Sequence, residues 1–361
     1  MVRSPRRAGW VRRQGEFDDK AKPLGRKLPH VAKGYQPRRA KPGRTKGAEI
    51  VDVGLQRVIS LKEAKRLYHK RFVTPYENPR NPRIGVPKKW TTHEVDHRKE
   101  RSVLVLRDIE TGQVRSPFFG PHFAAASDQL APAWQVIARL ISKGLARQKV
   151  LTLQRLAKIA PILVTTDFAS KRSSSGKARG KILHIGVRRR RRQWGPYAHK
   201  PSAAAMHRQL FAEGRRLAAA MVAADAQHNQ DELARARAAV GALRAALRNQ
   251  GLELPFLNDA YNVGVFGNSA GNPQHVDNND LVGSLFCPLG TAPLMFALPE
   301  YEVYVQAQRG DILYLNTPQV LHGACVPPHG VATARMFAAA RKEHLTFGLY
   351  CSKTVRNVRS D

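Results

Sequence analysis

Short apolar runs separated by glycine and proline dominate the last hundred residues of the chain. Each run is five or six residues long and rich in β-branched, aromatic and aliphatic side chains, which is typical of strands. Their close spacing predicts an all-β sandwich or barrel. The runs are Tyr261–Phe266, Val282–Cys287, Leu294–Leu298, Tyr301–Val305, Asp311–Leu315, Thr333–Ala338 and Leu345–Tyr350.

Two stretches within this region predict how individual strands are placed. Apolar and polar residues alternate from Tyr301 to Gln306, so one face of this strand is expected to pack inward and the other to face water. Arg309-Gly310-Asp311 predicts a turn into a buried strand at Ile312–Leu315. His322 then follows at the far end of a short loop.

The preceding residues show helical periodicity instead. Apolar side chains recur at helical spacing from Ser127 to Pro161, which predicts two packed support helices followed by a loop from Ser170 to Gly180. The alanine-rich stretch Ser202–Gln250 predicts a helical hairpin packed on one face, with a break between Asp225 and Asp231.

Two further elements are predicted nearer the start of the chain. Ser60 and Glu63 form a capping box, which predicts a short helix that ends before Pro75. Ser102–Leu106 and Gln113–Ser116 flank a Glu-Thr-Gly turn and predict a hairpin that adds strands to the main sheet.

The charge of the chain is large and unevenly distributed. Of 361 residues, 61 are Lys or Arg and 27 are Asp or Glu, a formal net charge of +34. Residues 251–361 hold 7 Lys and Arg against 9 Asp and Glu, so the excess lies in residues 1–250. A neutral half joined to a strongly cationic half predicts a polyanionic partner, which we expect to be DNA, with RNA as the alternative, bound by a monomer.

Composition also predicts the domain organisation. Residues 1–47 hold 15 Lys and Arg among many Pro and Gly and are expected to form a disordered basic arm that contacts DNA or directs import. Residues 48–250 are expected to form a support region with a basic insertion at 170–200, and residues 251–361 the catalytic core. We expect residues 48–361 to form one compact unit.

The basic insertion contains an unbroken arginine run, Arg188, Arg189, Arg190, Arg191 and Arg192, followed by Trp194 and Tyr197. Arginines beside aromatic rings suit phosphate contacts combined with stacking on bases. A nuclear-import signal is an equally good interpretation of the same run. A nuclear location is therefore predicted, with an organellar one as the alternative.

Other compartments fit the sequence less well. Three cysteines, Cys287, Cys325 and Cys351, are too few and too scattered for a disulfide framework or a zinc cluster, which favours a reducing compartment. There is no run of eighteen apolar residues and no apolar signal-peptide core. Membrane insertion and secretion are therefore not expected.

The candidate chemistry centres on His275-Val276-Asp277, with His322 forty-seven positions later. Two imidazoles and one carboxylate on one side of a metal leave three coordination positions open, as a non-haem Fe(II) oxygenase requires. Zinc, or a metal-free barrel in which both histidines are satisfied by packing, remains an alternative.

A second histidine pattern is present in His93-Glu94-Val95-Asp96-His97, which matches the two-histidine pattern of zinc proteases. Charged residues crowd the segment and a predicted strand follows almost at once. We therefore interpret it as a polar loop.

The last hundred residues resemble the 2-oxoglutarate and Fe(II)-dependent oxygenases. The resemblance rests on His-x-Asp at the end of an early strand, the Gly-Asp turn before His322, and Arg335 thirteen residues beyond it. It implies an α+β fold with a double-stranded β-helix core, of the jelly-roll or cupin kind. It also implies Fe(II) bound by His275, Asp277 and His322, with 2-oxoglutarate held at its far carboxylate by Arg335.

A narrower resemblance concerns the substrate. The His-x-Asp-x-x-Asp form, which ends at Asp280, and the basic remainder of the chain look most like the TET/JBP branch, which oxidises the methyl group of 5-methylcytosine or thymine. This implies that Asp280 accepts a hydrogen bond from a cytosine amine and that His344 contacts the base. Ascorbate in place of 2-oxoglutarate is the alternative co-substrate.

Two other functions stay open at this point. One is a non-catalytic basic nucleic-acid-binding or chromatin protein on a degenerate barrel. The other is an oxygenase that hydroxylates a basic protein's side chain or repairs an alkylated base.

Overall fold

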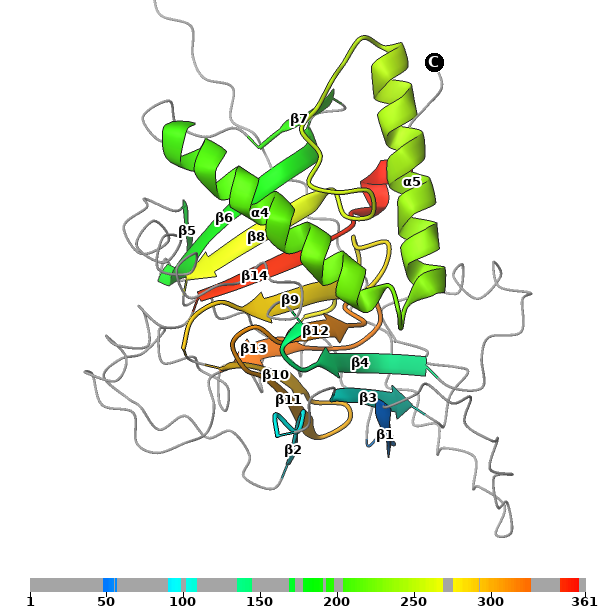
Figure 1. The fold of residues 1–361 in the computed structure, drawn as a ribbon, viewed down its shortest axis with the longest axis vertical. Coiled ribbons are helices and arrows are strands. Elements are labelled where there is room, and N and C mark those ends of the chain that lie inside the picture. Colours follow the sequence, from blue (N-terminus) through cyan, green and yellow to red (C-terminus); the bar gives the residue numbers. More distant parts are fainter. Residues whose placement is uncertain are drawn as a thin grey trace, which may run out of the picture. The chain divides into compact units, whose positions relative to one another are not determined.

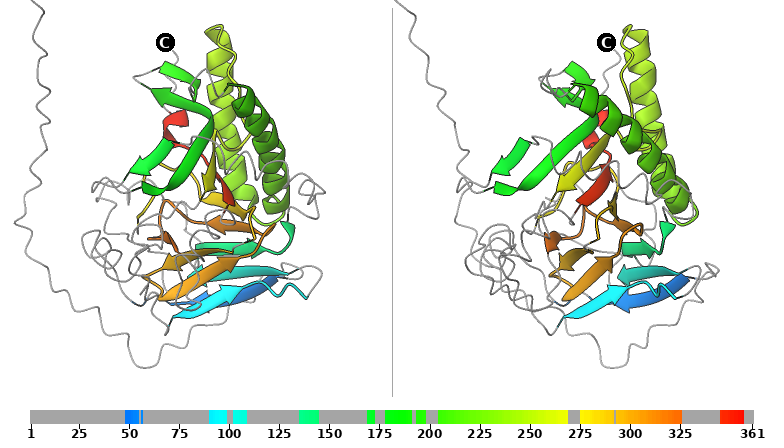
Figure 2. Two further views of the ribbon diagram at one scale, coloured as in Figure 1. Left: turned by 90° about the vertical axis from the view of Figure 1, so that its left-hand side faces the viewer. Right: turned by 60° about the vertical axis from the view of Figure 1, so that its left-hand side comes forward.

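Two β-sheets face each other, and two long helices cover the outer face of the larger sheet (Figures 1 and 2). The arrangement comes from a computed structural model. It describes residues 48–54, 56, 90–98, 102–108, 135–144, 169–172, 178–190, 193–197, 204–268, 275–291, 293–325 and 345–356. All of them belong to one unit, Thr45–Asp361.

The larger sheet has ten strands. In spatial order they are β1 (Ala48–Val53), β3 (Val103–Asp108), β4 (Gln135–Ile141), β12 (Ile312–Leu315), β9 (Ser284–Pro288), β14 (Leu345–Tyr350), β8 (Val263–Asn268), β6 (Ala178–Arg190) and β5 (Ala169–Arg172), with β7 (Gln193–Pro196) paired to β6. The neighbours pair antiparallel except β1 and β3, which are parallel.

The smaller sheet has four strands. Their order is β13 (Gly323–Cys325), β10 (Leu294–Leu298), β11 (Val303–Ala307) and β2 (Thr91–Glu94). The chain passes repeatedly between the sheets, with β9 in the larger, β10 and β11 in the smaller, β12 in the larger, β13 in the smaller and β14 in the larger. This alternation between facing sheets makes the core a double-stranded β-helix, as predicted, and the two sheets do not close into one barrel in the described part of the chain.

The apolar sequence of β12 shows how the larger sheet is buried on both faces. Ile312 and Tyr314 pack into the cluster beneath the helices, whereas Leu313 and Leu315 pack into the cluster between the sheets. Because successive strand residues point to opposite faces, an uninterrupted apolar run fits a central strand with no wet side.

The helical hairpin consists of α4 (Ala204–Asp225) and α5 (Gln230–Asn249), and a short 3-10 helix, η3 (Lys353–Arg356), follows β14. Both the hairpin and its break between Asp225 and Asp231 are confirmed. Helix α5 buries one stripe against the protein, made of Leu233, Ala236, Val240, Leu243 and Leu247. Neither helix of the described part of the chain is long and apolar enough to cross a membrane.

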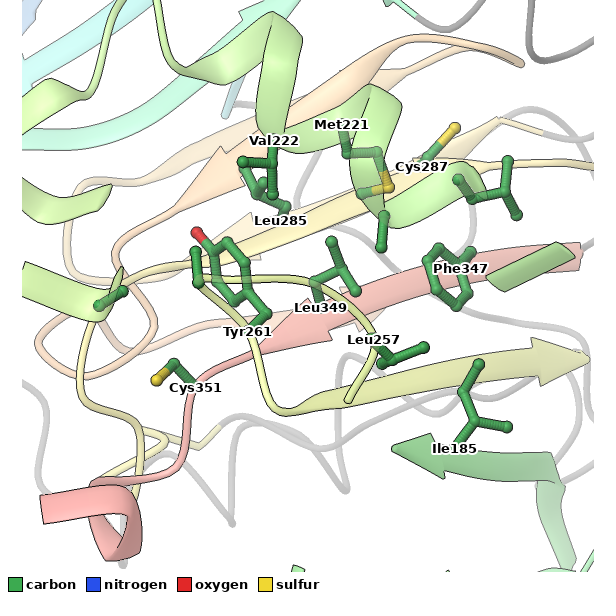
Figure 3. Close-up of a cluster of buried hydrophobic side chains, with 14 of the residues drawn as sticks. Ile185, Met221, Val222, Leu257, Tyr261, Leu285, Cys287, Phe347, Leu349 and Cys351 are labelled. Carbon is green, nitrogen blue, oxygen red and sulfur yellow. The ribbon is translucent and has the colours of Figure 1, made fainter. Parts of the chain in front are cut away.

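The core beneath the hairpin joins α4 to the sheet (Figure 3). Met221 and Val222 of α4 lie over Leu285 and Leu349, which belong to neighbouring strands β9 and β14. At another point on α4, Gly214 permits a close approach to β6, since a Cβ there would lie 2.2 Å from Cδ1 of Ile185. Cys287 and Cys351 lie in the same core as free buried thiols.

Strands β10 and β14 begin and end where the apolar runs predict, and β12 begins one residue later than its run. Strands β8 and β11 are shifted by two residues, and β9 begins two residues and ends one residue later than predicted. The predicted turn before β12 is confirmed, with Gly310 at φ +85° and the Asp311 amide bonded to Gln308 O at 2.9 Å. The wet face predicted for β11 is partly wrong, because Glu302 and Gln306 are partly exposed but Tyr304 between them is buried. Tyr304 is 1% exposed because Trp90 covers it, with ring centroids 5.1 Å apart.

The prediction of a helix around Trp134–Ile141 is wrong. Gln135–Ile141 is strand β4, paired antiparallel with β3 on one side and β12 on the other. Ile137, Ala138, Leu140 and Ile141 are all buried. A strand buried on both faces has apolar residues at nearly every position, so its spacing also satisfies a helical template.

The loop predicted at Ser170–Gly180 is also partly wrong, because Ala169–Arg172 and Ala178–Arg190 are paired strands at the sheet edge. The predicted Ser102–Leu106 strand is confirmed as part of β3, although it pairs with β1 and β4. Several predictions lie outside the described residues: the arm 1–47, the Ser60–Pro75 helix, Gln113–Ser116, the helix beyond Gly144 and the Thr333–Ala338 strand.

Candidate metal centre

His275 and His322 face each other across an isolated antiparallel bridge beside the smaller sheet. Each backbone amide donates to the other residue's carbonyl, at 2.9 Å from His275 and 3.0 Å from His322. Residues paired in this way project their side chains to the same face of a sheet. The imidazole centroids accordingly lie 4.5 Å apart, although the residues are far apart in sequence.

Asp277 lies between the two imidazoles. Its Oδ1 is 3.4 Å from His275 Nε2 and its Oδ2 is 3.6 Å from His322 Nε2. One ligand atom from each of the three residues lies within 4.8 Å of the others. Within the described ranges this is the one group of three or more His, Cys, Asp or Glu side chains that meets this condition.

His322 is held with one ring nitrogen directed at this cluster. Its side chain is 1% exposed, and its Nδ1 lies 2.9 Å from Val320 O. A carbonyl oxygen can only accept, so Nδ1 carries the proton in this hydrogen bond, and the lone pair of the neutral ring is on Nε2. That nitrogen is the one nearest Asp277.

Thr317 holds the Asp277 loop in place from the far side. The Asp277 amide donates to Thr317 O at 2.9 Å, and the Asp280 amide donates to Asp277 O at 2.9 Å. These bonds form a turn that directs the Asp277 carboxylate toward the histidines. His275 and Asp277 are half-exposed, with side chains 29% and 36% accessible, so the cluster is open on one side.

The donor set fits a divalent transition metal. Ligands about 2.1 Å from one ion at right angles have donor atoms about 3 Å apart, so the observed separations need only a small contraction. Two neutral imidazoles and one carboxylate on one face suit Fe(II), and they also suit zinc or other first-row metals.

Asp280, predicted to contact the substrate, lies buried behind the loop. Asp280 is 6% exposed. Its carboxylate accepts hydrogen bonds from Ser284 Oγ at 3.0 Å and from Thr317 Oγ1 at 3.3 Å. Burial, followed by the charge of Asp277, raises the pKa of Asp280 to about 8. These surroundings favour the role of a carboxylate that shapes the loop, and a contact with a base amine stays a prediction.

The end of β14 forms a second wall beside the loop. Ser352 is bridged to Asp280, and Lys353 Nζ donates to Asn278 O at 2.7 Å. The Tyr350 hydroxyl lies 3.2 Å from that of Tyr197. Burial raises the pKa of Tyr350, as does Tyr197, and the charges of Asp280 and Asp277 act in the same direction. Tyr350 therefore lies within electrostatic reach of the cluster.

The first three residues of the arginine run lie at the end of β6, where that strand pairs with β7 in a hairpin. Arg188, Arg189 and Arg190 pair in register with Gly195, Trp194 and Gln193. The Arg188 guanidinium lies 4.5 Å from the centre of the Tyr197 ring. The Tyr197 ring also stacks on the His184 ring, with the two ring centroids 5.1 Å apart. Arg190 is exposed. Through Tyr197 and Tyr350 this hairpin connects to the strand beside the cluster.

The two-histidine pattern of zinc proteases does not lie on a helix here. The polar loop predicted for this segment is partly wrong, because part of the segment is a strand. Thr91–Glu94 is β2, paired with β11, and His97 follows in a turn. His97 Nε2 lies 3.2 Å from Asp311 Oδ2, so it supports the turn before β12.

Four of the predicted site residues lie outside the described part of the chain. They are Arg335, His344, Arg191 and Arg192. Their predicted roles toward 2-oxoglutarate, the base and phosphates stay predictions. Conversely, the sequence offered no signal for Thr317, Ser284 or Tyr350, because their importance arises from neighbours distant along the chain.

Comparison with known proteins finds likenesses of structure only. No protein-family profile and no curated protein sequence matches the chain. A structure described as NgTET1 in complex with 5mC DNA is 13% identical with a TM-score of 0.38, and the match covers 62% of this chain and 75% of that one.

Two further structures are similar to a comparable degree. OsALKBH1 is 12% identical with a TM-score of 0.30, over 60% of this chain and 96% of that one. A Pseudomonas putida prolyl-4-hydroxylase is 14% identical with a TM-score of 0.31, over 60% and 93% respectively. Likenesses of this degree establish neither a family nor an activity, so the functional proposal rests on the residues of the site.

Proposed function

We propose that the protein is an Fe(II)-dependent dioxygenase that uses 2-oxoglutarate and O2 to oxidise the methyl group of a modified base in DNA, 5-methylcytosine or thymine. The observation that carries the proposal is the convergence of His275, Asp277 and His322 within a double-stranded β-helix. Three protein ligands on one face leave positions for a co-substrate and O2, which a purely structural metal site does not need.

The chain's own residues prepare the site for the metal. The Val320 carbonyl keeps the proton of His322 on Nδ1, and the Thr317 carbonyl holds the loop from which Asp277 projects. When bound, Fe(II) would supply the activation of O2 coupled to oxidation of 2-oxoglutarate. Arg335 is the residue proposed to hold the far carboxylate of 2-oxoglutarate, with ascorbate as the alternative co-substrate.

The charge of the chain supports a nucleic-acid substrate. A formal net charge of +34 attracts a polyanion, and Arg188, Arg189 and Arg190 lie on a hairpin connected to the site through Tyr197 and Tyr350. A base inside a duplex cannot present its methyl group to a metal, so the base would have to be flipped out of the stack. A nuclear location fits such a substrate.

One experiment tests metal, co-substrate and substrate together. The protein is incubated with Fe(II), 2-oxoglutarate and 5-methylcytosine-containing DNA, and nucleosides and succinate are quantified by mass spectrometry. We expect one succinate for each oxidised base. Oxidised base that forms with ascorbate alone and without succinate would instead establish the alternative co-substrate, and succinate without any oxidised base would point to another substrate.

Replacement of a ligand provides the control for the site. His275→Ala or Asp277→Ala should abolish turnover and iron binding while leaving the unfolding transition nearly unchanged, because both side chains are half-exposed. Full iron occupancy in His275→Ala would sink the assignment of the ligands. Wild-type protein that binds DNA but neither metal nor co-substrate would favour a non-catalytic nucleic-acid-binding protein.

A further inference from the structure

A cavity of about 510 Å³ lies at the open end of the helical hairpin, away from the histidine cluster. Its walls come from α4, α5 and the segment that follows α5. These elements cover the outer face of the larger sheet (Figure 1), whereas His322 directly precedes β13 of the smaller sheet and is bridged to His275. The volume falls within the range of small-molecule sites, roughly 300 to 1,000 Å³.

Three arginines line this cavity, and they outnumber its acidic lining residues. Elsewhere on the hairpin, Arg216 and Arg235 form ion pairs with Glu213 and Glu232, at 2.7 and 3.3 Å. By contrast, the cavity residues Arg215, Arg244 and Arg248 make no ion pair with any described residue. Glu253 is the one acidic residue in the lining, which leaves a net excess of two positive charges.

Arg244 is held ready for a ligand. Its guanidinium lies 4.7 Å from the centre of the Phe256 ring, and its Nη2 donates to Asn258 O. Its Nε is buried and has no hydrogen-bond partner among the described residues. Burial lowers the pKa of Arg244, Asp259 opposes this, and Arg248 and Arg215 lower it further. An anion in the cavity would relieve this repulsion.

The remaining lining is apolar. Leu247, Leu254, Pro255 and Phe256 form part of the wall, and Leu252 at the same cavity is 42% exposed. No other large hydrophobic side chain of the described residues is exposed to this degree. The cavity therefore offers an apolar surface for one part of a ligand and guanidinium groups for another.

We propose that this cavity binds a nucleoside phosphate unit, either as a free nucleotide or as part of a nucleic-acid strand. Guanidinium groups bind phosphate oxygens in pairs. The two or more negative charges of a nucleotide's terminal phosphates, or of two successive phosphodiesters in a strand, match the excess of two better than a single carboxylate does. The apolar wall accommodates the planar base. This site is separate from the metal centre and needs neither iron nor 2-oxoglutarate.

Binding is tested with the full chain in the presence of EDTA and near-physiological salt. A fluorescently labelled ATP is titrated by anisotropy and competed with unlabelled ATP, adenosine, pyrophosphate and a short single-stranded oligonucleotide. The test variant is Arg215→Gln with Arg248→Gln, which removes one charge from each helix at the cavity. The matched control is Arg216→Gln with Arg235→Gln, which removes one charge from each of the same helices outside it.

The expected result is saturable binding that weakens at least about tenfold for each cavity arginine removed, because hydrogen bonds to charged groups typically contribute this much. The control should change affinity less than about threefold. Circular dichroism melting must show both variants folded as the wild type. Competition by ATP alone identifies a free nucleotide as the source, and tighter competition by the oligonucleotide identifies a strand.

Three results would overturn the proposal. One is the absence of saturable binding to the wild type. Another is an equal loss in the test and control variants, which would show that the overall positive charge accounts for binding. The third is competition by pyrophosphate as effective as that by ATP, because the apolar wall would then contribute nothing.

Discussion

Replacement of Arg139 by methionine should destabilise the protein by about 3 to 5 kcal/mol, the usual cost of leaving one member of a buried ion pair without its partner. Arg139 lies on β4 and is 3% exposed, and its Nη1 is 2.5 Å from Oδ1 of Asp225, which is 0% exposed at the end of α4. The pair joins the helical hairpin to the larger sheet.

The surroundings of the pair set the magnitude. Asp225 would retain only the Asn229 amide, which donates to Oδ2 at 2.9 Å, so its charge would remain buried and largely uncompensated. The guanidinium also lies 4.9 Å from the centre of the Tyr314 ring, an interaction that methionine replaces only in part. Replacing both charges with apolar residues of similar volume is often neutral, since no charge is left buried.

Urea unfolding followed by fluorescence measures the effect in a double-mutant cycle. We expect Arg139→Met with Asp225→Leu to be less destabilised than Arg139→Met alone. Arg216→Met is the control, because its ion pair with Glu213 is exposed and should contribute less than about 1 kcal/mol. A cost below about 1 kcal/mol for Arg139→Met, or a double variant less stable than both single variants, would refute the reasoning.

Three further predictions concern the partner and the site. Deletion of residues 1–47 should make the slope of log affinity for DNA against log salt concentration shallower, by about 0.9 for each phosphate that the arm neutralises. The deletion should weaken binding to methylated and unmethylated DNA alike. An unchanged slope would assign the arm to import or solubility. Asp280→Asn should lower turnover because the Asp277 loop becomes looser, and it should not change which methylated base is oxidised because the carboxylate is buried. Nucleoside mass spectrometry measures this preference, and a changed preference would support a contact between Asp280 and the base. The raised pKa of Tyr350 adds stability that is fully present below about pH 10 and is lost as the pH rises toward the folded-state pKa. Burial also raises the pKa of Tyr261, Tyr301 and Tyr314, so phenolate absorbance should show at least four fewer tyrosines titrating near pH 10 than in unfolded protein. Tyr350→Phe should have one late-titrating tyrosine fewer than the wild type.

Local sequence signals determined the elements whose surroundings agree with their own preferences. The helical hairpin was predictable because its buried stripe, including Leu233 and Leu243, recurs at helical spacing while the opposite face is polar. The turn at Gly310 was predictable because only glycine adopts its positive φ readily. The apolar runs from Leu294 to Leu298 and from Leu345 to Tyr350 match β10 and β14 at both ends.

Tertiary structure decided the elements whose burial conceals their periodicity. Strand β4 carries apolar residues on both faces because helices cover one face of the sheet and the smaller sheet covers the other. Its pairing with β3 and β12, and not its own spacing, makes it a strand. The wet face expected for β11 is interrupted for a similar reason, since Trp90 packs on Tyr304.

The candidate site divides in the same way. The identity and order of His275, Asp277 and His322 were sufficient to predict a metal-ligand set, because few side chains bind metals and their chemistry does not depend on context. Their meeting at one point depends on a strand bridge across forty-seven residues, and their orientation depends on the Val320 and Thr317 carbonyls. Backbone carbonyls have no signature in a sequence, so only the folded chain could show which of them hold the ligands in place.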